Sequence, residues 1–366
     1  MHSPRPAFSQ NNIPVIFCTD GRFLPYTAVA LSSLAAAARD GYNYDLFIVS
    51  AEDIPSEAQN RLRAVLGAKE NISLRFVLTG NMRNLLPSRP LVRENYTLPT
   101  YYRLLLPHLF VNYDKVIYAD GDVFFMRSVH ELYALPLPPN CVLAAAPDVQ
   151  PYAGDENARR RFAAYVRGLG LGAASQYANA GILLWDLKAF RAQRLDEKLS
   201  EVLHSLCRPL FMDQDILNAA LAGKIYPLPL AYNFFAQEPD IRPPFDAEAE
   251  TYLRARREAA QNPAVIHYAG FAKPWFYPHM PYAAAWWQTA AQTPFYDEIL
   301  ARLRAHDRRM QRHWANAALA AKLYFYKIMN KLSGGRCEDK ILHVSDRLDM
   351  NNYWRKNRFK KQEEKL

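Results

Sequence analysis

The sequence has few cysteines and no long apolar run, and each of these absences excludes a class of protein. Its 366 residues include four cysteines, none of which forms a CxxC pair with another. We therefore expect neither a disulfide framework nor a structural zinc site. Because no run of about 18 apolar residues occurs, we expect no transmembrane helix. The first residues, MHSPRPAFSQNNIP, lack the apolar core of a signal peptide, which favours a cytoplasmic location.

The sequence does contain enough apolar and aromatic side chains for a large core. Hydrophobic residues make up 50% of the chain and aromatic residues 13%, which is typical of a large globular protein. The formal net charge is +9, and the final stretch, NNYWRKNRFKKQEEKL, is strongly basic. A basic tail with interleaved aromatic residues suits an anionic membrane surface or a nucleic acid. Since no nucleic-acid motif accompanies it, we expect no nucleic-acid partner.

The first half of the chain alternates short apolar runs with helical patterns. Strands are predicted over residues 15–19, 45–50 and 72–78, and helices over residues 25–38 and 56–66. A helical segment, TYYRLLLPHL, then leads into the strand KVIYAD. Such alternation is typical of parallel strands joined by crossover helices. We therefore expect an α/β fold with a parallel sheet flanked by helices.

The second half continues this pattern and then changes. Strands are predicted at CVLAAA, AGILLWDL and AVIHYA, and a helix over residues 213–222. Between Trp314 and Leu332 the apolar residues recur at three- and four-residue steps, which indicates an amphipathic, basic helix. We expect a flexible N-terminus (1–12), a catalytic domain (13–277) and a helical basic C-terminal region (278–366). This last region could lie on a membrane or pack on the catalytic domain as an ordinary solvated helix.

The stretch YADGDVFF places two carboxylates, Asp120 and Asp122, directly after a predicted buried strand. In open α/β sheets the ligand crevice lies beyond the carboxyl ends of the strands. Residues two apart in an extended chain point to the same side, so both acids could reach one ion if the backbone stays extended through Gly121. Carboxylate oxygens suit Mg²⁺ or Mn²⁺, often together with substrate phosphates. A solvated turn is the alternative, because Asp-Gly-Asp is also a common turn composition.

Six segments, in a fixed order, carry a resemblance to a known family. They are VIFCTDGRF (15–23), TYYRLLLP (100–107), KVIYADGDVFF (115–125), YANAGILLWDL (177–187), MDQDILN (212–218) and HYAGFAKPW (267–275). Through them the chain resembles the retaining family 8 glycosyltransferases, which include bacterial lipopolysaccharide α-galactosyl- and α-glucosyltransferases. The resemblance implies the GT-A fold, an α/β fold with a mixed, mainly parallel sheet flanked by helices. Several ordered matches are more specific than any single one.

The resemblance implies transfer of galactose or glucose from a UDP-sugar to a saccharide acceptor, with formation of an α-glycosidic bond. In this family the Asp-x-Asp pair holds Mn²⁺ against the donor diphosphate, which implies Asp120 and Asp122 as ligands here, with Mg²⁺ as the alternative ion. The implied third ligand is His267. Without the resemblance, a lone histidine at a strand end would be interpreted as structural.

The resemblance also implies which residues bind the donor. Gly270 and Lys273 would face its phosphates, because glycine lets the backbone approach closely and lysine adds a positive charge. Asp20 would bind the base or ribose, and Arg103 would lie near the donor, although a salt bridge on a helix surface is the alternative for Arg103. The implied donor-binding set is Cys18, Thr19, Asp20, Arg103, Asp120, Gly121, Asp148, Asn179, Gly270 and Lys273.

Asp213 and Gln214 are the catalytic residues that the resemblance implies. Together with Asp148 and Asn179 they would hydrogen-bond the hydroxyls of the donor sugar. Asp213 could alternatively cap a helix, with Gln214 in its first turn, and the two roles are compatible. Because glutamine is a poor nucleophile, we favour a same-face reaction in which the leaving phosphate helps to deprotonate the acceptor. In the alternative, Asp213 or Asp148 forms a covalent intermediate.

Two other functions stay open on the sequence alone. A glycogenin-like enzyme would use the same motifs to glucosylate a tyrosine of its own chain, which has 22 tyrosines. A non-catalytic protein would bind a membrane or nucleic acid through the basic tail, but the six segments would then have no purpose. We therefore expect an enzyme with a saccharide or glycolipid acceptor, above all lipopolysaccharide core, that works in the cytoplasm or peripherally on the inner face of the cell membrane.

Overall fold

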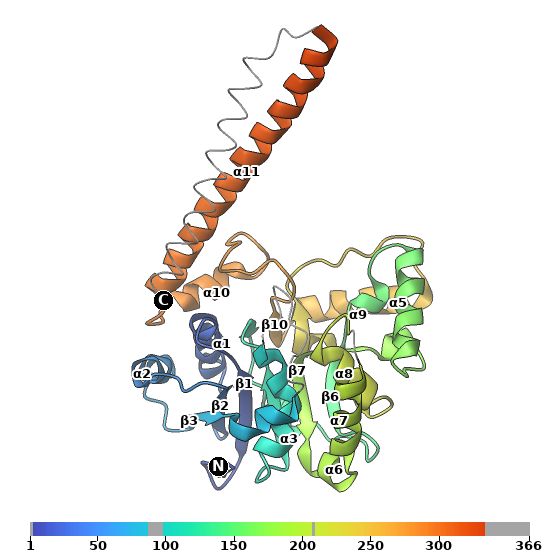
Figure 1. Cartoon of the computed structure of the whole chain (residues 1–366). Coiled ribbons are helices and arrows are strands. Elements are labelled where there is room, and N and C mark those ends of the chain that lie inside the picture. The colour runs from blue at the N-terminus through green and yellow to red at the C-terminus, as the bar shows by residue number, and fades with distance from the viewer. Residues whose placement is uncertain (1–2, 87–97, 207–208, 334–366) are drawn as a thin grey trace. The chain divides into compact units, whose positions relative to one another are not determined.

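The computed structural model describes residues 3–86, 98–206 and 209–333 and forms two compact units, Met1–Ile299 and Leu300–Leu366. The first unit is built on a seven-stranded sheet with the order β3-β2-β1-β4-β7-β6-β8 (Figure 1). Its strands are β1 (Asn12–Cys18), β2 (Asn43–Ser50), β3 (Ile72–Leu78), β4 (Lys115–Ala119), β6 (Leu143–Pro147), β7 (Ala178–Asp186) and β8 (Ile225–Pro227). The predicted α/β class is confirmed.

The pairing of the strands follows from the lengths of their connections. β1, β2, β3 and β4 run parallel and are joined by segments long enough to cross over the sheet, as the sequence predicted. β7 is antiparallel to both β4 and β6, and β8 is parallel to β6. The sheet is therefore mixed and mainly parallel, and nearly every residue of β1, β2 and β7 is buried.

A second, three-stranded sheet joins parts of the chain that are far apart in sequence. It contains β5 (Val123–Phe125), β9 (Phe234–Phe235) and β10 (Val265–His267), in the order β5-β10-β9. β5 follows β4 after one turn, and its antiparallel pairing with β10 sets His267 opposite Val123. This register brings the end of HYAGFAKPW to the Asp-Gly-Asp turn.

Helices cover both faces of the large sheet (Figure 1). On one face Val15 and Phe17 of β1 pack in a core with α1, α2, α9 and α10, while Ile16 and Cys18 face a second core with α3, α6, α7 and α8. The helices are α1 (Leu24–Ala36), α2 (Ser56–Ala64), α3 (Leu106–Leu109), α4 (His130–Ala134), α5 (Glu156–Gly168), α6 (Leu187–Ala192), α7 (Leu195–Ser205), α8 (Asp213–Ala220), α9 (Ala247–Gln261), α10 (Ala283–Ala290) and α11 (Tyr296–Ser333).

Local sequence explains where several helices begin. Asp155 and Asp246 accept hydrogen bonds from backbone amides of α5 and α9, and Asp186 does the same for α6. The segment TYYRLLLPHL, predicted as one helix, instead forms the 3₁₀ helix η2 (Leu98–Leu105) followed by the short α3. Pro107, in the first turn of α3, has no backbone N–H with which to continue the hydrogen bonding of the preceding turn.

The two ends of the chain were expected to lie outside the catalytic domain. Residues before β1, predicted to be flexible, make hydrogen bonds in the structure: Ser3 Oγ donates to Leu109 O, and Ala7 N donates to Asp45 Oδ2. At the other end, the predicted 314–332 helix falls within α11. The basic stretch beyond residue 333 lies outside the described residues. Within the described part of the chain, no helix combines the length and apolar content that crossing a membrane requires.

Candidate functional site

A cavity of about 210 Å³ lies beyond the carboxyl ends of β1 and β4, at the edge where the sequence predicted a ligand site. Residues from both sheets and from the start of α8 line it. Every predicted site residue except Asp148 is part of the lining: Cys18, Thr19, Asp20, Arg103, Asp120, Gly121, Asp122, Asn179, Asp213, Gln214, His267, Gly270 and Lys273. The predicted residues thus gather in one place.

The three predicted metal ligands lie together at this cavity. Asp120, Asp122 and His267 each offer one ligand atom, and these atoms lie within 4.8 Å of one another. His267 Nε2 is 3.4 Å from Asp122 Oδ1 and 3.8 Å from Asp120 Oδ2. Two carboxylates and an imidazole are a donor set that suits a divalent cation such as Mn²⁺ or Mg²⁺.

The backbone brings the two carboxylates together in a different way from the one predicted. The prediction required an extended chain through Gly121, whereas β4 ends at Ala119 and residues 121–122 form a turn before β5. The carboxylates converge at this turn, and the pairing of β5 with β10 brings His267 beside them. The alternative of a merely solvated turn does not hold, because the Asp122 side chain is only 14% exposed.

Two glycines leave the space that this arrangement needs. A Cβ atom on Gly181, in β7, would lie 2.2 Å from Cε1 of His267, so any other residue there would displace the imidazole. A Cβ atom on Gly121 would lie 2.6 Å from Thr27 Oγ1 in α1. Glycine is therefore required at both positions by close packing, and only the one at 121 belonged to the predicted set.

Each candidate ligand uses part of its hydrogen-bonding capacity on neighbours and directs the rest towards the other two. Asp120 Oδ1 accepts a hydrogen bond of 2.6 Å from the Tyr118 hydroxyl and lies 2.8 Å from the Arg103 guanidinium, while Oδ2 faces His267. Asp122 Oδ2 lies 2.5 Å from Lys273 Nζ, while Oδ1 faces His267. These neighbours therefore fix the orientation of each carboxylate, with one oxygen of each facing His267.

Electrostatics keep Asp122 ionised. Burial disfavours the charged carboxylate, but Lys273 and His267 outweigh burial and hold the pKa of Asp122 well below its ordinary value. Lys273 Nζ also donates a 2.6 Å hydrogen bond to Tyr268 O. A negatively charged carboxylate is the form that can bind a cation.

Arg103 is a buried cation between two carboxylates, rather than the surface salt bridge that the sequence left open. The residue is 4% exposed, and its guanidinium lies 2.8 Å from both Asp120 Oδ1 and Asp213 Oδ2. It also donates to the backbone oxygens of Thr100 and Ala180 and stacks over the Tyr118 ring. These contacts fix the positions of both carboxylates in the cavity wall.

Asp213 and Gln214 open helix α8 after a strained residue. Met212 is fully buried and has a φ of +50°, a value that non-glycine residues rarely adopt, and it turns the chain so that the next two side chains enter the cavity. Asp213 does not serve as the cap considered above, because the helix begins at that residue. Although Asp213 Oδ2 lies near Arg103 Nε, that N–H donates to Thr100 O, and within the described residues the carboxylate oxygen receives no hydrogen bond.

Burial also changes the acidity of Asp213, and this predicts a pH dependence of stability. Loss of solvent raises the pKa of Asp213 to about 7, against the opposing effect of Arg103. The folded protein keeps this proton up to about pH 7, whereas the unfolded chain releases it near pH 4. Asp213 therefore favours folding most below pH 4, and we expect this contribution, at most about 4 kcal/mol, to be lost as the pH rises to 7.

Urea unfolding at several pH values would test this prediction. Between pH 4.5 and 7 the wild type should lose stability relative to Asp213→Asn, which cannot ionise, and the difference should stay constant above about pH 8. Asp240→Asn, a change in an exposed ion pair, serves as the control and should show no such slope. A constant difference between wild type and Asp213→Asn over this range would contradict the prediction.

Asp148, Asn179 and Gln214 form one buried hydrogen-bond network at the cavity. Asn179 Nδ2 donates to Asp148 Oδ2 at 2.8 Å and to Gln214 Oε1 at 3.0 Å, and Gln214 Nε2 donates to Asp148 Oδ2 at 3.1 Å. Asp148 is thus linked to the cavity although it does not line it. Burial raises the pKa of Asp148, while these hydrogen bonds oppose that rise.

The predicted nucleotide-binding residues also line this cavity. Asp20 Oδ1 accepts hydrogen bonds from the backbone amides of Arg22 and Phe23 and so shapes the turn after β1. Burial raises the pKa of the Cys18 thiol far above its ordinary value, so this side chain is neutral. Gly270 has a φ of +81°, a left-handed conformation that favours glycine.

Sequence reasoning missed two buried polar residues that support the site. Asp215 accepts hydrogen bonds from the hydroxyls of Tyr165 and Tyr177 and from Phe211 N, which anchors the start of α8. Its place in MDQD was a signal, but spacing could not show which acid faces the cavity. Asn233 lies outside all six segments and contacts His267 Nδ1 at 2.8 Å. Only the pairing of β9 with β10 brings it there.

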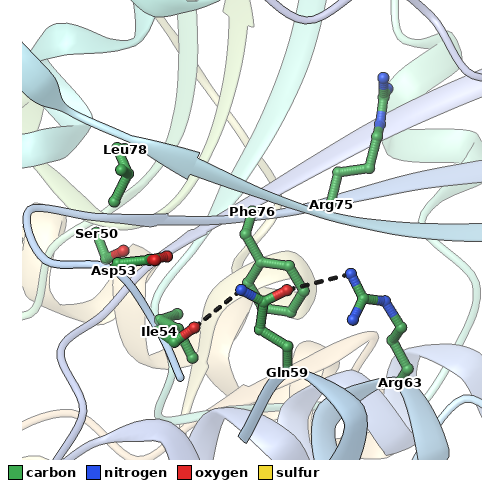
Figure 2. Close-up of a pocket in the computed structure, with 8 residues that line it drawn as sticks. All are labelled: Ser50, Asp53, Ile54, Gln59, Arg63, Arg75, Phe76 and Leu78. Atoms are coloured by element: carbon green, nitrogen blue, oxygen red, sulfur yellow. Dashed lines mark hydrogen bonds between the residues drawn. The ribbon is translucent and has the colours of Figure 1, made fainter. Parts of the chain in front are cut away.

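A second cavity, of about 400 Å³, lies between α2 and the ends of β2 and β3 (Figure 2). Its side chains do not converge: Gln59 bonds Ile54 O and Arg63, while Arg75 points away from both in Figure 2 and pairs with Asp45. Among the described residues that line this cavity there is no predicted site residue. The candidate site is therefore the cavity at β1 and β4.

Comparisons with known protein sequences agree with this choice. Residues 14–278 match the sequence profile of Glycosyl transferase family 8. The chain is 26% identical over 275 residues to the lipopolysaccharide 1,2-glucosyltransferase of Escherichia coli, covering 73% of this chain and 75% of that protein. It is 27% identical to a putative glycosyltransferase of Haemophilus influenzae, over 62% of this chain and 64% of that protein. The match thus spans slightly less than two thirds of the Haemophilus protein.

Solved structures with the same architecture were also found. The bifunctional glycosyltransferase WbbM superposes with a TM-score of 0.70 and 25% sequence identity, covering 82% of this chain and 53% of that chain. The galactosyltransferase LgtC, solved with donor and acceptor sugar analogues, superposes with a TM-score of 0.57 and 24% identity, covering 77% of this chain and 96% of that chain. The likeness to LgtC supports the fold.

Proposed function

Because this chain belongs to glycosyltransferase family 8, we propose that it transfers a hexose, galactose or glucose, from a UDP-sugar to a saccharide acceptor and forms an α-glycosidic bond. The observation that carries the proposal is the meeting of Asp120, Asp122 and His267 at a cavity that is also lined by Asn179 and Gln214, two members of a network of sugar-binding type. A diphosphate and a hexose are the two parts of one donor molecule, and each of these two groups of residues suits one part.

Asp120, Asp122 and His267 would hold the divalent cation, for which Mn²⁺ is our proposal and Mg²⁺ the alternative. When bound, the cation would supply positive charge that neutralises the diphosphate leaving group. The donor set fits such an ion, because one oxygen of each carboxylate and the Nε2 atom of the imidazole face one another. Lys273 would bind the phosphates, and Gly270 would let the backbone approach them.

The remaining cavity residues would bind the nucleoside and the sugar. Cys18 ends β1, Thr19 and Asp20 follow it, and these three residues would contact the nucleoside, with Gly121 leaving room beside them. Arg103 would hold Asp120 and Asp213 in position for the donor. Asp213 lines the cavity beside Asn179 and Gln214, and its carboxylate could accept hydrogen bonds from sugar hydroxyls, which supports a contact with the hexose.

We propose retention of configuration through a same-face reaction. Gln214 is held by Asn179, Ala180 N and Asp148, so its carbonyl oxygen has a fixed place near the sugar, where it would stabilise positive charge on the ring. Its weak nucleophilicity argues against a covalent intermediate on this residue. Mass spectrometry of the enzyme during turnover tests the alternative, in which Asp213 or Asp148 carries a glycosyl group.

Lipopolysaccharide core is our proposal for the acceptor, because two of the similar proteins are a lipopolysaccharide 1,2-glucosyltransferase and a lipopolysaccharide 1,3-galactosyltransferase. Such an acceptor is a glycolipid and would place the enzyme in the cytoplasm, peripherally at the inner face of the cell membrane. The basic tail would bind anionic lipid there. Loss of vesicle binding on deletion of residues 334–366 is the expected result.

A donor screen tests the proposed function directly. The purified protein is incubated with UDP-glucose or UDP-galactose, without acceptor, and UDP release to water is measured with Mn²⁺ or with EDTA. We expect one donor to be hydrolysed faster than the other, and release to fall to background with EDTA. Absence of release from every UDP-hexose would contradict the proposal. An increase in intact protein mass would instead indicate self-glucosylation.

A further inference from the structure

Asn233 connects the candidate metal ligands to the sugar-binding network. It ends the 3₁₀ helix η5 (Leu230–Asn233), is 3% exposed, and bonds His267 at one end of its amide and Asn179 at the other. We propose that Asn233 is a positioning residue that fixes the His267 imidazole for a divalent cation and, through its second bond, holds Asn179 for the donor sugar. The second half of this proposal rests on the proposed function.

Two backbone amides determine which way the side-chain amides point. A backbone N–H can only donate, so the atom of Asn179 that faces Gly181 N at 2.9 Å must be its oxygen. In the same way, Ala180 N identifies the oxygen of Gln214, which accepts from Asn179 Nδ2. The orientation of the Asn179 amide therefore follows from a fixed donor, Gly181 N, on one side and a fixed acceptor, the Gln214 oxygen, on the other.

The orientation of Asn233 follows from that of Asn179. The Asn179 oxygen can accept but not donate, so the Asn233 atom 2.7 Å from it must be the amide nitrogen. The Asn233 oxygen then faces His267 Nδ1, and the imidazole must carry its hydrogen on Nδ1 to make that bond. In the neutral imidazole, the form that binds a metal ion, this leaves the lone pair on Nε2, the atom directed at Asp120 and Asp122.

A hydrogen bond to the far nitrogen of a ligating histidine has two consequences. It fixes the plane of the ring and makes the other nitrogen a better ligand, and loss of such a bond typically weakens metal affinity about 10- to 100-fold. In this chain Asn233 makes that bond, while Gly181 leaves room for the ring on its other side. An apolar residue at position 233 would let the ring rotate and would give no preference between the two tautomers.

Two substitutions of Asn233 separate its two bonds. Asn233→Ala removes both, and we expect the dissociation constant for Mn²⁺, measured without nucleotide from the electron paramagnetic resonance signal of free Mn²⁺, to rise about 10- to 100-fold. Asn233→Asp keeps an oxygen facing Nδ1 and should restore the dissociation constant to within about threefold of the wild type. It lacks the N–H that binds Asn179, so UDP-hexose hydrolysis should stay at least about tenfold below the wild type.

Asn218→Ala is the matched control. Asn218 is a buried asparagine that bonds backbone atoms of Ala178 and Gln214 but contacts no candidate metal ligand. We expect its loss to lower the melting temperature and to leave Mn²⁺ affinity unchanged. Equal weakening of Mn²⁺ binding in Asn218→Ala and Asn233→Ala would overturn the proposal, because it would assign both effects to general destabilisation.

The remaining outcomes distinguish this inference from the proposed function. If the wild type binds Mn²⁺ and folded Asn233→Ala binds it equally well, the inference is wrong and the proposed function stands. If Asn233→Asp binds Mn²⁺ as weakly as Asn233→Ala, the acceptor role of Asn233 is wrong. If the wild type itself binds no Mn²⁺ with or without UDP, the metal part of the proposed function fails, and the inference fails with it.

Discussion

Asp122→Asn is expected to lower UDP-hexose hydrolysis at least about 10³-fold, the larger of the two greatest effects that the structure predicts. Such a loss corresponds to about 4 kcal/mol of transition-state stabilisation. The substitution removes the carboxylate that lies 3.4 Å from His267 Nε2 and 2.5 Å from Lys273 Nζ, so it removes a proposed metal ligand and releases the lysine from its present partner. The measurement is UDP release at saturating Mn²⁺, with the Mn²⁺ dissociation constant measured on the same samples.

A control shows whether the loss belongs to this carboxylate. Asp53→Asn makes the same chemical change at an exposed residue of the second cavity (Figure 2) and should leave hydrolysis within about twofold of the wild type. The melting temperature of each variant shows that it is folded. More than a tenth of wild-type hydrolysis in folded Asp122→Asn would rule out Asp122 as a metal ligand.

Arg103→Met is expected to have the largest effect on stability. The guanidinium lies between Asp120 and Asp213, and its removal leaves both carboxylates without that partner in a poorly solvated site. Breaking a buried ion pair from one side destabilises by about 3–5 kcal/mol, which corresponds to a fall of about 5 °C in the melting temperature of a chain of this length. Because protonation removes the uncompensated charge, the difference from the wild type should be smaller at pH 5 than at pH 8.

The size of the effect distinguishes a buried cation from a surface ion pair. Arg160→Met breaks an exposed pair with Glu156, one turn apart on α5, and should change stability by less than about 0.5 kcal/mol. Arg103→Lys keeps the charge but not the flat, forked guanidinium. Its loss of stability should therefore lie between the losses for Arg160→Met and Arg103→Met. A loss for Arg103→Met no larger than that for Arg160→Met would contradict the burial that the structure describes.

Much of the fold could be predicted from the sequence because local signals agreed with one another. Apolar runs such as VIFCT alternate with helical patterns, and this alternation determines parallel strands and crossover helices without further information. The conformation of TYYRLLLPHL was harder to predict, because its apolar spacing fits an α-helix while Pro99 and Pro107 interrupt the hydrogen bonding. Pairings between distant segments, such as β5 with β10, have no local signal.

In the candidate site, too, only the residues with a local sequence signal could be predicted. Its charged residues were predicted because they stand in recognisable short segments, and the structure gathers them in one cavity. The residues that hold them were not. Asn233 acts through a contact with a residue 34 positions away, and Asp215 through contacts with tyrosines 38 and 50 positions away. Met212 shows its role only in its backbone angle, which no composition reveals.

The pairing of β5 with β10 gives a bound ion a mechanical role as well as a chemical one. A long segment of the chain separates Asp120 and Asp122 from His267 in the sequence, although the three residues lie together in the structure. An ion coordinated by all three residues would cross-link these two parts of the chain. Such a cross-link opposes the separation of β5 from β10 during partial unfolding. Occupancy of the site would then set how long the intervening segments stay assembled when the protein is heated.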